Sequence, residues 1–125
     1  MRQIDIAFLC GFVSYFLGGW TVALQALIIF IAVDYAVGVI VAAYLGQLSS
    51  KIGFRGIAKK VLILALVSVA YILDDMVLGG GYWLRDATIF FYIANETISI
   101  LENVGKTSLP LPPKLKDAIE ILKNK

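Results

Sequence analysis

The residues of this sequence that could do chemistry begin with a carboxylate inside an apolar segment. Asp34 is the only charged residue between positions 6 and 50. An ionised carboxylate near the middle of a membrane-spanning helix costs roughly 2.5 to 3.5 kcal/mol on insertion scales. Asp34 therefore indicates either an anchor for a hydrogen bond between helices or a pore-lining group. Small residues that allow close helix packing follow it at intervals of four: Gly38, Ala42 and Gly46.

A second set of polar residues recurs at steps of three and four between positions 83 and 104. Arg85 begins this stripe and Glu96 borders it, but they lie about 16 Å apart along a helix axis and cannot neutralise each other. Glu96 must therefore be protonated, face water, or meet a partner on another helix or subunit. We expect oligomerisation or a wet pore to complete its surroundings, and a monomeric bundle that buries the stripe is the alternative. The stripe consists of Arg85, Thr88, Tyr92, Asn95, Ser99 and Glu102.

The sequence lacks the side chains that many enzyme mechanisms need. It has no His and one Cys, which excludes Ser-His-Asp and Cys-His catalysis, a typical zinc site and an internal disulfide. Cys10 stands in an apolar run and is interpreted as a small hydrophobic side chain. No glycine-rich phosphate-binding motif occurs. We therefore expect a protein that is not an enzyme, with no cofactor, no metal and no nucleic-acid partner.

The elements that must position these side chains are apolar helices. Of 125 residues, 60% are hydrophobic and 16% are charged, and the mean hydropathy is +0.87. Residues 6–33 carry no charge, a run longer than the roughly 20 residues that cross a hydrocarbon core. The sequence predicts an all-α integral membrane protein, with a bundle of four transmembrane helices in residues 1–104 and a basic cytoplasmic tail in residues 105–125. The predicted spans are residues 4–17, 20–45, 57–73 and 83–104.

The first of these spans is short. A helix over residues 4–17 reaches only about 21 Å, so it is either a tilted span in a thin membrane or a segment that lies in the interface. Gly18 and Gly19 predict the turn that ends it, and the glycines at positions 79–81 predict the turn between the third and fourth spans.

Basic residues predict the orientation, because cytoplasmic loops are enriched in Lys and Arg. The connector over residues 46–60 holds four basic residues and the tail holds five, together nine of the 11 in the chain. If both segments are cytoplasmic, the N- and C-termini are cytoplasmic as well, and the turn at residues 78–82 is outside. Trp20 and Trp83 then fall at the outer boundary, as interfacial aromatic residues should. The topology determinants are Lys51, Arg55, Lys59, Lys60, Lys114 and Lys116.

The tail begins with a proline-rich spacer that cannot be helical throughout. Apolar residues then recur at helical spacing while charged residues occupy the other faces, which predicts a short amphipathic cytoplasmic helix. We expect this helix to rest against the bilayer or the bundle, and docking of a partner is the alternative. Its apolar residues are Leu115, Ala118, Ile119 and Leu122.

Four strings of the sequence carry a resemblance to a known family. They are Asp34-Tyr35 followed by Gly38, KIGFRGIAKK at residues 51–60, ANETISILEN at residues 94–103, and the proline-containing residues 109–115. Together they resemble the toxin-secretion and phage-lysis holins. The resemblance implies a large homo-oligomer in the bacterial cytoplasmic membrane. It further implies that this assembly forms lesions, depolarises the cell and releases an endolysin or toxin as cargo, with the lipid bilayer as the other partner.

Two other classes of function stay open. Four short spans with a membrane-embedded carboxylate are also typical of a small multidrug exporter or an ion channel. The lysine-rich tail argues against the exporter. An accessory subunit that pairs Glu96 with a larger membrane partner is the third class.

Overall fold

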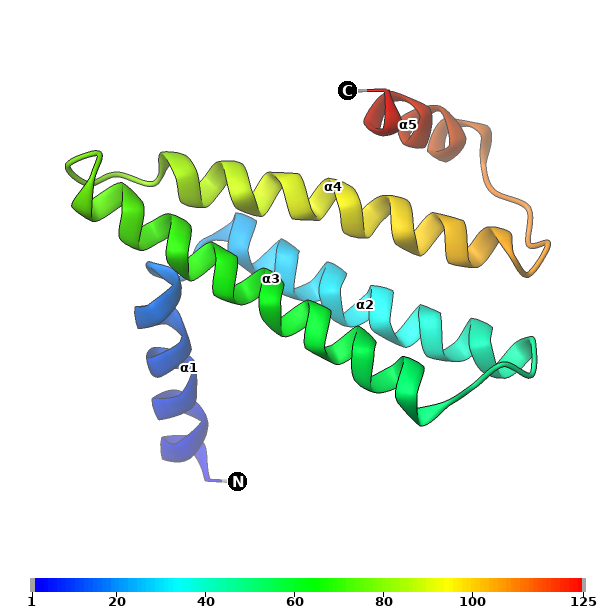
Figure 1. Cartoon of the computed structure of the whole chain (residues 1–125), viewed down its shortest axis with the longest axis horizontal. Helices are drawn as coiled ribbons and strands as arrows, with labels where there is room; N and C mark the ends of the chain where they lie inside the picture. The colour runs from blue at the N-terminus through cyan, green and yellow to red at the C-terminus, as the bar shows by residue number, and fades with distance from the viewer. Residues whose placement is uncertain (1, 125) are drawn as a thin grey trace.

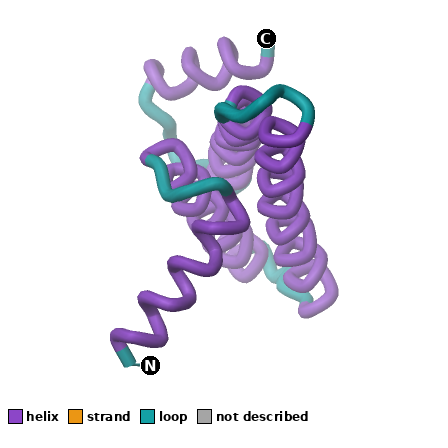
Figure 2. The backbone as a smooth tube through the Cα atoms, turned by 90° about the vertical axis from the view of Figure 1, so that its left-hand side faces the viewer, coloured by secondary structure: helices purple, strands orange, loops and turns teal. Residues whose placement is uncertain are grey.

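The computed structural model describes residues 2–124, which form five α-helices and no β-strand within that range. Three long helices, α2 (Val22–Tyr44), α3 (Ser50–Met76) and α4 (Trp83–Gly105), lie side by side with alternating directions (Figure 1). α1 (Gln3–Leu17) leaves one end of this bundle at a steep angle, and α5 (Pro113–Lys123) folds back beside α4. In Figure 2 the three long helices group together while α1 projects from them. The all-helical prediction is confirmed.

The helices differ in how well they suit a membrane. α2 and α3 are long and apolar enough to span it, judged by length and composition, and α1 is apolar but shorter. α4 is as long as α2, but its charged and amide side chains make it less apolar. Large apolar side chains such as Phe8, Ile40, Phe54 and Phe91 are exposed, which suits a surface in contact with lipid. The number of spans stays a prediction.

α1 does not join the bundle as a fourth parallel element. It packs chiefly against α3, where the Ser68 hydroxyl donates a hydrogen bond to the Phe16 carbonyl at 2.8 Å. Gly18 and Gly19, with φ of 88° and 104°, turn the chain sharply after α1, a backbone conformation that other residues rarely adopt. The expected bundle of four helices is therefore a bundle of three, and the direction of α1 fits the interfacial alternative.

The start of α3 corrects the predicted connector. The third span is predicted to begin at residue 57, but the helix that contains it, α3, begins at Ser50. The Ser49 hydroxyl accepts a hydrogen bond from the Ile52 N–H at 3.1 Å and caps this helix. The basic residues of the connector are therefore helical. Lys59 is exposed, whereas its neighbour Lys60 turns toward the other helices.

An apolar core connects all four of the first helices. Its buried members lie toward the end of the bundle where α1 joins, since Leu17 is the last residue of α1. The turn predicted at residues 79–81 is confirmed, and all three glycines there have positive φ. The core residues are Leu17, Leu24, Leu27, Ile63, Val67 and Ile89.

Candidate functional site

Three charged side chains meet at the centre of the bundle and are called the inner cluster: Asp34 of α2, Lys60 of α3 and Glu96 of α4. Lys60 Nζ lies 2.5 Å from Asp34 Oδ2 and 2.8 and 2.6 Å from the two Glu96 carboxylate oxygens. The Asp34 and Glu96 side chains are 6% and 4% exposed, and that of Lys60 is 19% exposed. One lysine thus ties three helices together through charged hydrogen bonds, which are stronger than neutral ones.

The formal charges of the inner cluster do not cancel, because two carboxylates share one ammonium group. Asp34 Oδ1 is buried and has no hydrogen-bond partner among residues 2–124. Over the same described range, no group of three His, Cys, Asp or Glu side chains could hold a metal ion. Asp34 Oδ1 is therefore the one oxygen of the inner cluster that could still accept a hydrogen bond from a further donor.

A cavity of about 370 Å³ lies beside the inner cluster, between α2, α3 and α4. Gly38 and Ala42 contribute to its wall. A Cβ added at Gly38 would approach only Asn103 Nδ2, at 3.9 Å. Gly38 and Ala42 thus border open space instead of the close helix contact that their spacing predicts.

The close approach between helices occurs at two other glycines. A Cβ at Gly53 would lie 3.3 Å from the Tyr35 hydroxyl, and one at Gly56 would lie 3.4 Å from the Tyr35 ring. Gly46, the third residue of the predicted packing face, lies beyond the end of α2 with φ of 70°. It contributes to a turn, so the predicted face ends at Ala42.

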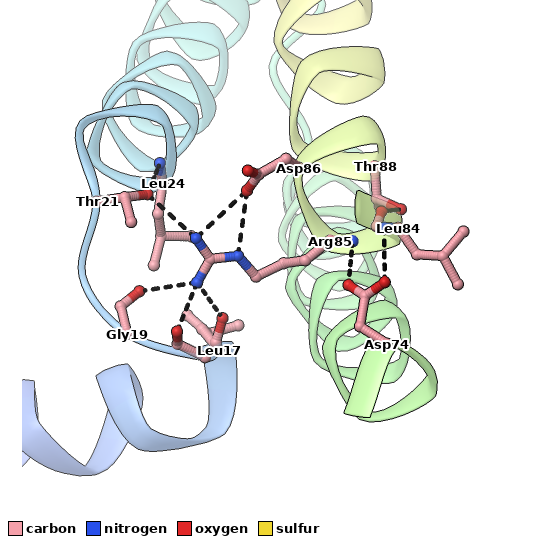
Figure 3. Close-up of polar contacts among 10 residues, drawn as sticks. Leu17, Gly19, Thr21, Leu24, Asp74, Leu84, Arg85, Asp86 and Thr88 are labelled. Carbon is pink, nitrogen blue, oxygen red and sulfur yellow. Dashed lines mark hydrogen bonds and ion pairs between the residues drawn. The ribbon is translucent and has the colours of Figure 1, made fainter. Parts of the chain in front are cut away.

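A second group of buried polar side chains, called the outer cluster, surrounds Arg85 where α1 ends and α4 begins (Figure 3). Arg85 is 1% exposed. Its Nη1 donates to the carbonyl oxygens of Leu17, Gly18 and Gly19 at 3.1, 2.8 and 3.2 Å. Its Nε and Nη2 reach Asp86 Oδ1, both at 3.3 Å. The guanidinium therefore holds the chain where α1 ends.

Asp74 completes the outer cluster from α3. It is fully buried, and its two carboxylate oxygens accept the backbone N–H groups of Leu84 and Arg85 at 2.8 and 2.9 Å (Figure 3). The first N–H groups of a helix have no partner within the helix, so Asp74 caps α4. In the sequence, Asp74 directly follows the predicted span over residues 57–73. No local capping motif could have found it, because it belongs to the preceding helix.

The structure divides the polar stripe of α4 between different surroundings. Arg85 and Glu96 are buried in the outer and inner clusters. Asn95 and Glu102 are exposed, and Glu102 pairs with Lys123 of α5 at 3.3 Å. The remaining residues are half-buried, and they are Thr88, Tyr92 and Ser99.

Lys60 is the member of the inner cluster whose position the sequence does not predict. The sequence places it among the cytoplasmic charges, whereas the structure pairs it with Glu96. Of the alternatives left open for Glu96, the structure therefore shows a partner on another helix of the same chain. The signal was present, because Asp34 and Glu96 both need a cation at depth. Lys60 is the last basic residue before a long apolar run. The remaining topology determinants are exposed, namely Lys51, Arg55, Lys59, Lys114 and Lys116.

The class that these features define is a small, all-helical protein suited to a membrane. The chain matches the model of the bacteriophage holin family over residues 11–124, and it belongs to that family. A "Probable holin" of Bacillus phage phi105 is 31% identical over 122 residues, which cover 98% of this chain and 84% of the relative.

Proteins of bacteria are also similar to this chain. "Uncharacterized protein Lmo0128" of Listeria monocytogenes is 47% identical over 108 residues, covering 86% of this chain and 76% of the relative. "Uncharacterized protein BH0965" of Halalkalibacterium halodurans is 40% identical over 121 residues, covering 94% and 90%. No solved structure matches the chain.

Proposed function

We propose that the chain is a holin that accumulates in the bacterial cytoplasmic membrane, assembles with copies of itself and opens lesions. The lesions depolarise the cell and let an endolysin or toxin leave. The observation that carries the proposal is the family match, which spans nearly the whole chain and includes both the inner and the outer cluster. The exposed apolar side chains of the long helices support insertion in a bilayer.

The orientation follows from the basic ends of the helices. We place the α2–α3 connection and the tail in the cytoplasm and the α3–α4 turn outside. Lys51, Arg55 and Lys106 then lie on the cytoplasmic side, where loops are enriched in basic residues. α1 decides the position of the N-terminus. A spanning α1 puts it in the cytoplasm, as the sequence predicts, and an interfacial α1 leaves it outside. Reporter fusions at both termini and at Gly80 measure the orientation, and an external C-terminus contradicts it.

Assembly is supported by an exposed amide in the middle of α4. Asn95 is the exposed polar residue next to the buried Glu96, and an amide that faces lipid gains from a partner on another helix. Such bonds contribute about 0.6 kcal/mol on average, an effect that repeats at each interface of a large assembly. Asn95→Leu should shorten the ladder of crosslinked oligomers, whereas Phe90→Leu, an apolar change on the exposed surface of α4, should not.

Controlled expression tests the function. A holin should arrest growth and collapse the membrane potential abruptly, followed by release of a co-expressed endolysin. The rival function, a small exporter or ion channel that uses a membrane-embedded carboxylate, draws support from the cavity beside Asp34. An exporter should confer resistance to cationic drugs without arrest, and an accessory subunit should do neither. Growth without depolarisation at full expression would contradict the holin proposal.

A further inference from the structure

We propose that the groove between α3 and α4 is the contact surface for a second copy of this chain, in which Arg55 of each copy pairs with Glu102 of the other. The inference rests on the proposed function, because it names the surface through which the copies begin to assemble. It depends on an apolar groove, on opposite charges along its two edges, and on the equal depth of these charges in the bundle.

The groove is open and apolar. Its volume is about 450 Å³, and residues of α3 and α4 alone line it. Large side chains along it remain exposed, such as Leu66 and Phe91 at 46% and 59%. Because lipid tails are as apolar as these side chains, helices in a membrane associate through close packing and polar contacts. The groove offers the packing surface, and polar groups beside it must supply the specificity.

The edge that α3 contributes to the groove ends in a basic residue. Residues four and seven positions apart share one face of a helix. Arg55 is exposed, and the ion pairs found among residues 2–124 do not include it. The edge of α3 therefore presents a free positive charge beyond the apolar groove, and it consists of Arg55, Leu62, Leu66 and Leu73.

The edge that α4 contributes ends in an acidic residue at the same spacing. Glu102 pairs with Lys123 of its own chain at 3.3 Å, but it is 57% exposed and stays accessible to a second cation. Asn95, to which assembly is attributed above, lies on this edge as well. The edge of α4 consists of Leu84, Phe91, Asn95 and Glu102.

The two charges lie at the same depth. Lys60 of α3 contacts Glu96 of α4, so these residues set a common level. Arg55 is five residues from Lys60 and Glu102 is six residues from Glu96, toward the same end of the bundle. At 1.5 Å per residue, both charges lie about 7.5 to 9 Å from that level. α3 and α4 diverge toward this end (Figure 1), which leaves Arg55 to a partner outside the chain.

A second copy inserted in the same direction has its charges at the same depth. A two-fold axis along the membrane normal makes such a contact self-complementary. α3 of each copy then lies beside α4 of the other, and the pair between Arg55 and Glu102 forms twice. Opposite charges at equal depth also select this register over a displaced one.

The chain has enough open surface for such a contact. It exposes 8792 Å², whereas a compact monomer of 13.7 kDa exposes about 6,600 Å². The difference exceeds the roughly 800 Å² that each partner buries in a standard interface.

Crosslinking between two differently tagged copies of the full-length chain in membranes tests the contact. Cys10, the only cysteine, is first replaced by Ser. One copy then carries Leu66→Cys and the other Phe91→Cys, so that a disulfide between the two sites must join two chains. We expect a crosslinked heterodimer on mild oxidation. The control replaces Leu66→Cys by Ile40→Cys, which lies exposed on α2. Heterodimers no more abundant than in the control would overturn the proposal and leave lipid in the groove.

Charge reversal tests the pair itself. Arg55→Glu or Glu102→Arg alone should lower the heterodimer yield at least about fivefold, because like charges then meet, and both changes in one chain should restore it. Lys123→Ala, which removes only the pair within the chain, should leave the yield unchanged. A reporter at the C-terminus verifies the orientation of each variant. A yield that ignores both reversals would overturn the pairing and leave anionic headgroups as the partner of Arg55. Depolarisation is scored separately in cells, so either proposal can fail alone.

Discussion

The inner and outer clusters both bury charge in the same bundle, yet they satisfy it differently. Arg85 donates to three backbone carbonyls and to Asp86, and Asp74 accepts two backbone N–H groups. The inner cluster consists of side chains alone, and one oxygen of Asp34 has no partner among residues 2–124. Buried charge by itself therefore does not indicate function, and incomplete pairing beside a cavity is the more specific sign.

Position along the helices explains the difference. The outer cluster lies where α1 ends and α4 begins, and helix ends have carbonyl and N–H groups without partners inside the helix. Arg85 and Asp74 use these groups. The inner cluster lies about 16 Å further along α4, where the backbone groups are occupied by the helix itself. Only side chains can pair there, so charge balance depends on which side chains the sequence supplies.

The largest effect is expected from removing the cation of the inner cluster. Lys60→Met leaves two buried carboxylates facing each other, and breaking a buried ion pair in this way costs about 3 to 5 kcal/mol. Unfolding in micelles by denaturant should show the loss. The control is Lys59→Met, which changes the exposed neighbour and should leave the stability almost unchanged. Equal effects of the two variants would show that Lys60 does not pair at depth.

A triple variant separates stability from activity at the inner cluster. Replacing the whole set by apolar residues of similar size, with Asp34→Leu, Lys60→Met and Glu96→Met, should recover most of the lost stability, because a complete buried ion network can often be replaced in this way. We predict that this variant folds but does not depolarise the membrane. A triple variant that kills with normal timing would reduce the inner cluster to a structural role, like the outer one.

The same contrast explains what the sequence could and could not predict. The helix over residues 83–104 is observed at Trp83–Gly105, because charge and apolar spacing are local signals. Lys60 was misplaced because a basic residue near an apolar run looks the same whether it flanks a span or enters it. Its partners Asp34 and Glu96 are far away in sequence, and only packing brings them together.

The outer cluster was harder still to predict. Arg85 binds backbone carbonyls, which leave no trace in residue type, and Asp74 caps a helix other than its own. Asp74 reaches the start of α4 because the turn at residues 77–82 brings the end of α3 beside it. The angle of α1 likewise depends on Gly18 and on the carbonyls that Arg85 holds, so a short apolar segment alone could not distinguish a span from an interfacial helix.

The next effect concerns Arg85. Arg85→Met should cost about 2 to 3 kcal/mol, since buried carbonyl groups lose their donor, and it should loosen α1 more than the bundle. Hydrogen exchange or proteolysis at Gly18–Gly19 should rise selectively. Arg85→Lys keeps the charge but offers fewer donors, so its stability should lie between that of Arg85→Met and that of the unchanged protein. If Arg85→Met instead changed depolarisation without loosening α1, the outer cluster would have a role in lesion formation and not only in structure.

A smaller effect is expected at the cap of α4. Asp74→Asn keeps one acceptor oxygen but loses the charge and the second acceptor, and weakening a helix cap costs about 1 kcal/mol. Asp75→Asn is the matched control, because Asp75 is exposed. The melting temperature of the purified protein measures both. A loss at Asp75 as large as at Asp74 would indicate general charge effects at this end of the bundle.

The smallest effect is expected at the exposed pair between α4 and α5, which provides the reference for both clusters. Lys123 Nζ lies 3.3 Å from Glu102 Oε1, and the two side chains are 44% and 57% exposed. Exposed ion pairs contribute about 0.2 to 1 kcal/mol and are screened by salt. A double-mutant cycle with Lys123→Ala and Glu102→Gln should give a coupling in this range that falls at high salt. The corresponding cycle for Lys60 and Glu96 should give a larger coupling that salt hardly changes, because water and ions reach those side chains poorly. Equal couplings with equal salt dependence would mean that water and ions reach the inner cluster as easily as they reach the exposed pair. The inner cluster could then not be treated as a buried ion network.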